Sequence, residues 1–208
     1  MRRALLLVAA LALLALPAAA RADGDPASDW LLTQAQFVPP DDGVPAAYSK
    51  QLAAVLSDAE ARGYRIRVAV IGTRYDLGSV YVDWQKPKRY TPFLSEELSF
   101  VYKGRVLVVM ANGLAVARDG KPIPADQAVV DKILPAGSSG AALTAAATRA
   151  VVKLAAAHGA VVTVPPLGHT TKPTTGGDRV TIAAGGLVVV ALLVAGGVWR
   201  RSRVKARA

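Results

Sequence analysis

The last 29 residues constrain this chain of 208 residues more than any other segment does. Residues 180–199 hold no charged side chain, and five basic residues follow at once in 200–208. A helix of twenty residues is about 30 Å long, which matches the hydrocarbon core of a bilayer. The sequence therefore predicts a single C-terminal transmembrane helix at 180–199. The basic flank predicts that residues 200–208 form a cytoplasmic tail.

The first 22 residues have the layout of a signal peptide. Arg2 and Arg3 precede an apolar run at 4–16, and Ala20-Arg21-Ala22 fits the small-x-small pattern before a cleavage point. Retention of this segment as an uncleaved anchor is the alternative. Both interpretations place the main domain outside the cytoplasm, and cleavage leaves a single-pass protein of the cell membrane.

A net charge of +10 is typical of nucleic-acid-binding proteins, but the distribution of the charge along the chain argues against that function. Residues 23–178 contain 16 basic and 15 acidic residues, so the excess lies almost entirely in the two terminal segments. The charge therefore reflects targeting and anchoring, and no nucleic-acid partner is expected. The absence of cysteine excludes disulfides and thiolate metal sites, so the outer domain has to be held by its own core.

The segment between the two terminal regions divides by composition. Residues 23–45 are polar and rich in proline, which predicts an extended N-terminal arm, and residues 165–179 are a Thr/Pro/Gly stalk. Residues 46–164 predict one exported α/β domain, a small sandwich with a mixed sheet of three or four strands. Its predicted helices are 46–62, 91–103, one within 122–135, and 139–158. Gly63 is predicted to end the first of them, and Ser138 or Ser139 to cap the start of the last. Its predicted strands are 65–72, 106–110, 114–117 and an edge strand at 161–164.

The central strands carry a family resemblance. VAVIG follows a helix, a second helix comes next, and GRVLVVM turns back through Asn112-Gly113. With a signal peptide before and a membrane span after, this order resembles the TPM-domain family. The resemblance implies the sandwich fold and a role in assembly or maintenance of membrane complexes. It also implies phosphatase activity in some members, but it assigns no catalytic residue in this sequence.

Polar residues follow the two predicted parallel strands at their carboxyl ends, where ligands bind in sheets of this kind. Arg74 and Asp76 come after the first strand, and Asn112 comes after the second. Asp76 with Asn112 could ligate a hard divalent cation, calcium or magnesium, and Arg74 could bind an anion. The alternative is that Asp76 only closes a turn.

Aromatic and cationic residues alternate in the connection at 75–93, where no helical period is visible. Trp84 stands beside Lys86 and Lys88. Rings among cations suit a wall glycan, lipid headgroups or a protein partner. The alternative is that the aromatic side chains hold the connection on the core. We expect Trp84 to be presented outward, and Tyr90 and Phe93 to pack inward.

Three functions are compatible with these features. The favoured one is a non-enzymatic interaction or assembly factor of the envelope, since no nucleophile elbow, phosphate loop or zinc-protease motif occurs. A metal-dependent, phosphatase-like hydrolase that uses Asp76 is the first alternative. A wall-sorted surface protein is the second, because residues 172–176 resemble a cell-wall sorting signal whose leading Leu is replaced by Lys.

The predicted topology can be tested directly because the chain has no cysteine of its own. In intact cells, Ser49→Cys should react with a membrane-impermeant maleimide. Ser202→Cys should react only after permeabilisation, because the basic flank keeps it in the cytoplasm. The opposite labelling pattern would show that the charge argument assigns the wrong orientation.

Overall fold

The computed structural model describes residues 24–40 and 43–168. In these residues one five-stranded mixed sheet has the order β1-β2-β3-β4-β5. β1, β2 and β3 are parallel, β4 is antiparallel to β3, and β5 is antiparallel to β4. The α/β class and the parallel central pair are confirmed, although the sheet has more strands than expected. The strands are β1 (Gln36–Phe37), β2 (Ile66–Val70), β3 (Arg105–Met110), β4 (Gly113–Arg118) and β5 (Lys121–Pro122).

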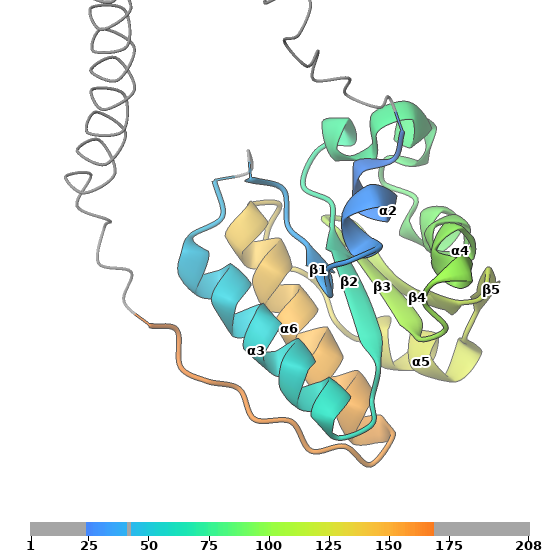
Figure 1. The fold of residues 1–208 in the computed structure, drawn as a ribbon. Helices are drawn as coiled ribbons and strands as arrows, with labels where there is room; N and C mark the ends of the chain where they lie inside the picture. The colour runs from blue at the N-terminus through green and yellow to red at the C-terminus, as the bar shows by residue number, and fades with distance from the viewer. Residues whose placement is uncertain (1–23, 41–42, 169–208) are drawn as a thin grey trace, which may run out of the picture. The chain divides into compact units, whose positions relative to one another are not determined.

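Helical segments cover both faces of the sheet (Figure 1). Side chains of α3, α5 and α6 form one core with the sheet, and side chains of α2, η2, α4 and η3 form the other. Neighbouring residues of a strand enter different cores, as Val68 and Ala69 of β2 do, which the continuous apolar runs predict. The helices are α2 (Pro26–Leu31), α3 (Ala46–Ala61), α4 (Pro87–Glu97), α5 (Pro124–Val130) and α6 (Gly140–Ala157). The 3₁₀ segments are η2 (Arg74–Asp83) and η3 (Leu98–Phe100).

The two long helices end where their sequence signals place them. After α3, Gly63 adopts a left-handed φ of +83°, and the Tyr64 N–H donates to the Ala59 carbonyl at 2.8 Å. At the start of α6, the Ser139 side chain accepts from the Ala142 N–H at 3.3 Å. Both capping predictions are confirmed.

The expected irregular connection after β2 is instead largely helical. It forms η2 and the first turn of α4, which begins at Pro87 and not at Thr91 as predicted. Pro87 occupies the first helical position, which proline favours, and Pro92 lies inside the helix. The 3₁₀ segment is interrupted at Gly78, where φ is +50°, so no period of 3.6 residues could reveal it.

Turn chemistry corrects the predicted hairpins. Met110 pairs with Gly113, so the β3–β4 turn consists of Ala111 and Asn112, one residue earlier than expected. The missed strand β5 follows Asp119-Gly120, and both of these residues have a positive φ, as a two-residue hairpin turn requires.

The predicted edge strand at 161–164 is wrong. The Thr163 N–H donates to Asp58 Oδ2 at 2.8 Å, so the side chain of a helical residue takes the place of a neighbouring strand.

The segment predicted as an extended arm is part of the domain, since it contributes α2 and β1. The Asp25 carboxylate accepts the Ala27 N–H at 3.0 Å and the Tyr90 hydroxyl at 2.5 Å, deep between α2 and α4. Burial raises the pKa of Asp25 to about 6, although the hydrogen bond from Tyr90 acts in the opposite direction. The N-terminal segment is thus attached through a buried polar contact as well as through apolar side chains.

The predicted signal peptide, the span at 180–199, the tail at 200–208 and residues 169–179 of the stalk lie outside the described residues. Among the described helices, α6 is long and apolar enough to cross a membrane by length and composition. More than half of it is buried, and its apolar side chains pack against α3 and the sheet.

The raised pKa of Asp25 predicts a specific pH dependence of stability. The folded chain holds the proton up to about pH 6 whereas the unfolded chain releases it near 3.8, so this group lowers stability as pH rises through that window. Asp25→Asn removes the titration and keeps the side-chain shape. As pH rises from about 4 to about 7, the urea unfolding midpoint of wild type should fall relative to that of Asp25→Asn. An unchanged difference between the two unfolding midpoints would contradict the buried Asp25–Tyr90 contact.

Candidate functional site

A cavity of about 470 Å³ lies between the start of α4, the β3–β4 turn and the end of α5. Three of the predicted ligand-binding residues, Lys86, Lys88 and Asn112, line it. The structure therefore joins residues that the sequence assigned to two different candidate sites. The other lining residues are Gln85, Pro87, Arg89, Gly113, Leu114, Val130, Asp131, Ile133 and Leu134.

Asn112 is positioned by a contact across the mouth of the cavity. It occupies the β3–β4 turn, at the carboxyl end of a central parallel strand. Its Nδ2 donates to the Gln85 carbonyl at 2.5 Å, and Gln85 has an unusual left-handed φ of +58° two residues before the start of α4. The amide of Asn112 thereby ties the hairpin to the N-terminus of α4.

Cations and a helix N-terminus make one side of the cavity electropositive. Lys88 pairs with Asp131 at 3.0 Å, and the Lys86 ammonium donates to the Val82 carbonyl at 2.9 Å. A hydrogen bond from Gln127, followed by the contact with Lys88, holds the pKa of Asp131 below its ordinary value. The N-terminus of α4, which begins at Pro87, adds the partial positive charge of the helix dipole.

Part of the cavity wall is apolar, with Leu114, Val130, Ile133 and Leu134. A site with this division can hold an acidic group against the cations while an apolar group packs on the wall.

Arg74 and Asp76 do not line this cavity. Asp76 Oδ2 accepts the Gly72 and Thr73 N–H groups at 2.9 and 2.7 Å, and closes a capping box at the start of η2. Arg74 lies over the rings of Tyr75 and Tyr81, at 5.4 and 5.8 Å from their centroids. The structure therefore assigns Asp76 a structural role, and the predicted cation site at Asp76 remains a prediction. Among the described residues, no three His, Cys, Asp or Glu side chains form a group that could hold a metal ion.

Trp84 is half-buried and packs against the core beneath α4, so the expected outward presentation is wrong in part. Tyr90 is fully buried, as expected, whereas Phe93 is exposed. Within the aromatic connection, Tyr90 and in part Trp84 hold the segment on the core, whereas Tyr75, Tyr81 and Phe93 are exposed.

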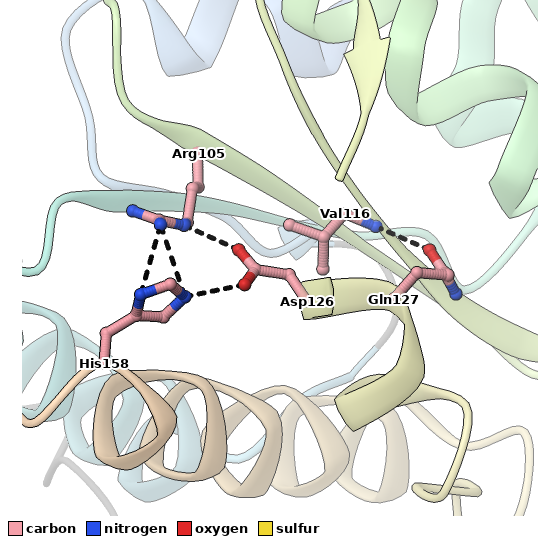
Figure 2. Close-up of polar contacts among 5 residues, drawn as sticks. All are labelled: Arg105, Val116, Asp126, Gln127 and His158. Carbon is pink, nitrogen blue, oxygen red and sulfur yellow. Dashed lines mark hydrogen bonds and ion pairs between the residues drawn. The ribbon is translucent and has the colours of Figure 1, made fainter. Parts of the chain in front are cut away.

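A second polar cluster lies at the opposite end of the strands, at the amino end of β3 (Figure 2). Asp126 of α5 is almost fully buried and accepts Arg105 Nε at 2.6 Å, while His158 Nε2 lies 2.7 Å from its other carboxylate oxygen. The Arg105 guanidinium also lies 4.8 Å from the centroid of the Tyr64 ring, which packs against His158. The cluster joins the start of β3, α5 and the end of α6. No local pattern in the sequence predicts this cluster, because its members lie far apart in the chain.

Gln127, the next residue of α5, fixes this helix on the sheet (Figure 2). Its Oε1 accepts the Val116 N–H at 3.2 Å, and its Nε2 donates to the Leu114 carbonyl at 3.0 Å. β5 pairs only with the last residues of β4, so the earlier part of this strand has a free edge. The amide side chain of Gln127 satisfies backbone groups along that edge and so protects it from pairing with another strand. Through this contact α5 carries Val130 and Asp131 to the cavity.

Comparisons with protein-family models, with curated proteins and with solved structures give no match to this chain. The resemblance to TPM domains therefore remains a prediction from the sequence.

The cluster at Asp126 predicts a large effect on stability. Asp126→Ala leaves the Arg105 guanidinium without its carboxylate, which should cost about 3 kcal/mol of unfolding free energy. The control is Glu60→Ala, which removes the partner of Arg65 in an exposed pair and should cost less than about 1 kcal/mol. Equal costs in urea unfolding would contradict the structural role of the cluster.

Proposed function

We propose that this chain is a single-pass membrane protein of the cell envelope whose outward TPM-like domain is a non-enzymatic binding module for a membrane-complex partner. The predicted signal peptide, span and basic tail support the location in the cell envelope. The cavity beside α4 carries the proposal of binding, because it gathers Lys86, Lys88 and Asn112 against an apolar wall.

The partner that fits this cavity is a protein segment with an acidic group beside an apolar side chain. The cations and the helix N-terminus favour the acidic group, and Leu114, Ile133 and Leu134 favour the apolar one. A volume of about 470 Å³ accommodates a few side chains rather than a folded surface.

The hydrolase alternative has less support from the described contacts. It needs Asp76 as a metal ligand. One oxygen of that carboxylate already accepts two backbone N–H groups in the turn before η2, so the side chain is engaged in a structural contact. Metal-dependent phosphatase turnover by the purified chain, lost in Asp76→Asn, would nevertheless replace the binding proposal. The wall-sorting alternative concerns residues 172–176, which lie outside the described residues.

The binding proposal can be tested by site-specific photo-cross-linking of the full chain in its native membrane. A photoreactive amino acid at Leu134, which lines the cavity and is 74% exposed, should give a discrete cross-linked protein adduct. The control is the same amino acid at Val161, which is 75% exposed and does not line the cavity, and it should give none. Lys86→Glu together with Lys88→Glu should abolish the adduct at Leu134, because the charge that attracts the acidic group is reversed. An adduct that survives this double change, or equal adducts at both positions, would overturn the assignment of the cavity.

A further inference from the structure

The 3₁₀ segment η2 presents large side chains to solvent that its packing does not require. Tyr75 is 80% exposed, Tyr81 54% and Val82 52%, whereas Leu77 of the same segment is fully buried in the core. The Arg74 guanidinium lies over both tyrosine rings. Arg74, Tyr75, Tyr81 and Val82 therefore form one exposed aromatic and cationic surface, which we call the tyrosine surface.

This surface stands on a fixed part of the domain. The Thr73–Asp76 capping box closes one end of η2, and the Ser79 N–H donates to the Gly24 carbonyl at 3.3 Å. At Gly78 a Cβ atom would lie 2.1 Å from the Gly24 carbonyl oxygen, so the N-terminal segment packs directly on the backbone of η2. The tyrosines are thus held outward by a rigid support rather than by a loose loop.

The tyrosine surface lies at the end of the domain where the described chain enters, and the described chain leaves toward that end. Gly24, the first described residue, contacts η2. α3 precedes β2 in the chain and packs antiparallel to it (Figure 1). The start of α3 therefore lies near the carboxyl end of β2, which η2 follows. The last described residues run toward the start of α3, because Thr163 bonds Asp58 and the Pro165 carbonyl then accepts Gln51 Nε2 at 2.6 Å.

A span at 180–199 would limit how far the domain can move from the membrane. From Gly168 to Val180 the chain can reach at most about 40 Å when fully extended. A tether of that length holds the domain at a high local concentration beside the bilayer, so even a weak contact with lipid is populated.

We propose that the tyrosine surface rests on the outer face of the bilayer, in contact with anionic phospholipid headgroups. Tyrosine favours the boundary between lipid and water, where its ring is sheltered and its hydroxyl is hydrated. Arg74, which lies over both tyrosine rings, supplies the positive charge that attracts anionic lipid. This proposal rests on the proposed single-span topology. It also places the cavity, which lies at the same end of the strands, beside the membrane, where a membrane-borne partner can reach it.

The test uses the full chain reconstituted in vesicles that contain phosphatidylglycerol and a lipid with a nitroxide on its headgroup. Ser79→Cys on η2 and, as a matched control, Ser57→Cys on α3 each give one labelling site, since the chain has no cysteine. The lipid nitroxide should quench a fluorophore at position 79 several-fold more than one at position 57. Adding Tyr75→Ser and Tyr81→Ser to the Ser79→Cys chain, or replacing phosphatidylglycerol with a zwitterionic lipid, should reduce the quenching at 79 toward the level at 57.

Flotation separates failure of this proposal from failure of the span. A chain that floats with the vesicles after alkaline washing but shows equal quenching at both positions is anchored without docking, which overturns the proposal and leaves the topology standing. A chain that does not float contradicts the span itself, and with it both proposals. A fluorophore at position 79 that responds to soluble wall-glycan fragments and not to lipid would show that the surface binds glycan, and would also overturn the proposal.

Discussion

The rest of the structure depends on two strands that have no polar face. β2 and β3 run parallel, and their side chains enter apolar cores on both sides of the sheet. A strand pair of this kind is stable only when helices cover both of its faces. α3 and α6 supply one cover. The connection between the two strands supplies most of the other, because η2, α4 and η3 all lie between β2 and β3 in the chain.

The features that could be predicted are those whose signal is local. Continuous apolar runs identified β2 and β3, and Ser139 and Gly63 marked helix ends through side-chain and backbone chemistry that acts within one turn. The 3₁₀ geometry of η2 could not be predicted, because it has neither of the regular periods and is broken at Gly78. The Asp119-Gly120 signal for β5 is local and was available in the sequence, but only the structure shows that a strand of two residues follows it.

The candidate site shows the same division between local and non-local information. Asn112 could be selected as a binding residue from its place after a predicted strand, and Lys86 and Lys88 from the aromatic residues among which they stand. Their convergence depends on the contact of Asn112 with Gln85 and on the position of α5, which Gln127 fixes from a distance along the chain. The Arg105–Asp126–His158 cluster is non-local throughout, since each member comes from a different element, and no spacing in the sequence could have revealed it.

The placement of polar groups gives the two ends of the strands different roles. At the end where β3 begins, the charges of Arg105 and Asp126 neutralise one another in a buried contact that joins three elements. At the opposite end the cations near the start of α4 remain largely exposed beside the cavity, and the tyrosine surface follows β2. A closed charge cluster fixes the elements that it joins, because the loss of one partner leaves a buried charge unpaired, whereas exposed cations beside apolar and aromatic surface are available to a partner. The second end is also the one to which the N-terminal segment attaches and toward which the last described residues run, so the exposed binding surfaces and both ends of the described chain lie on the same side of the domain.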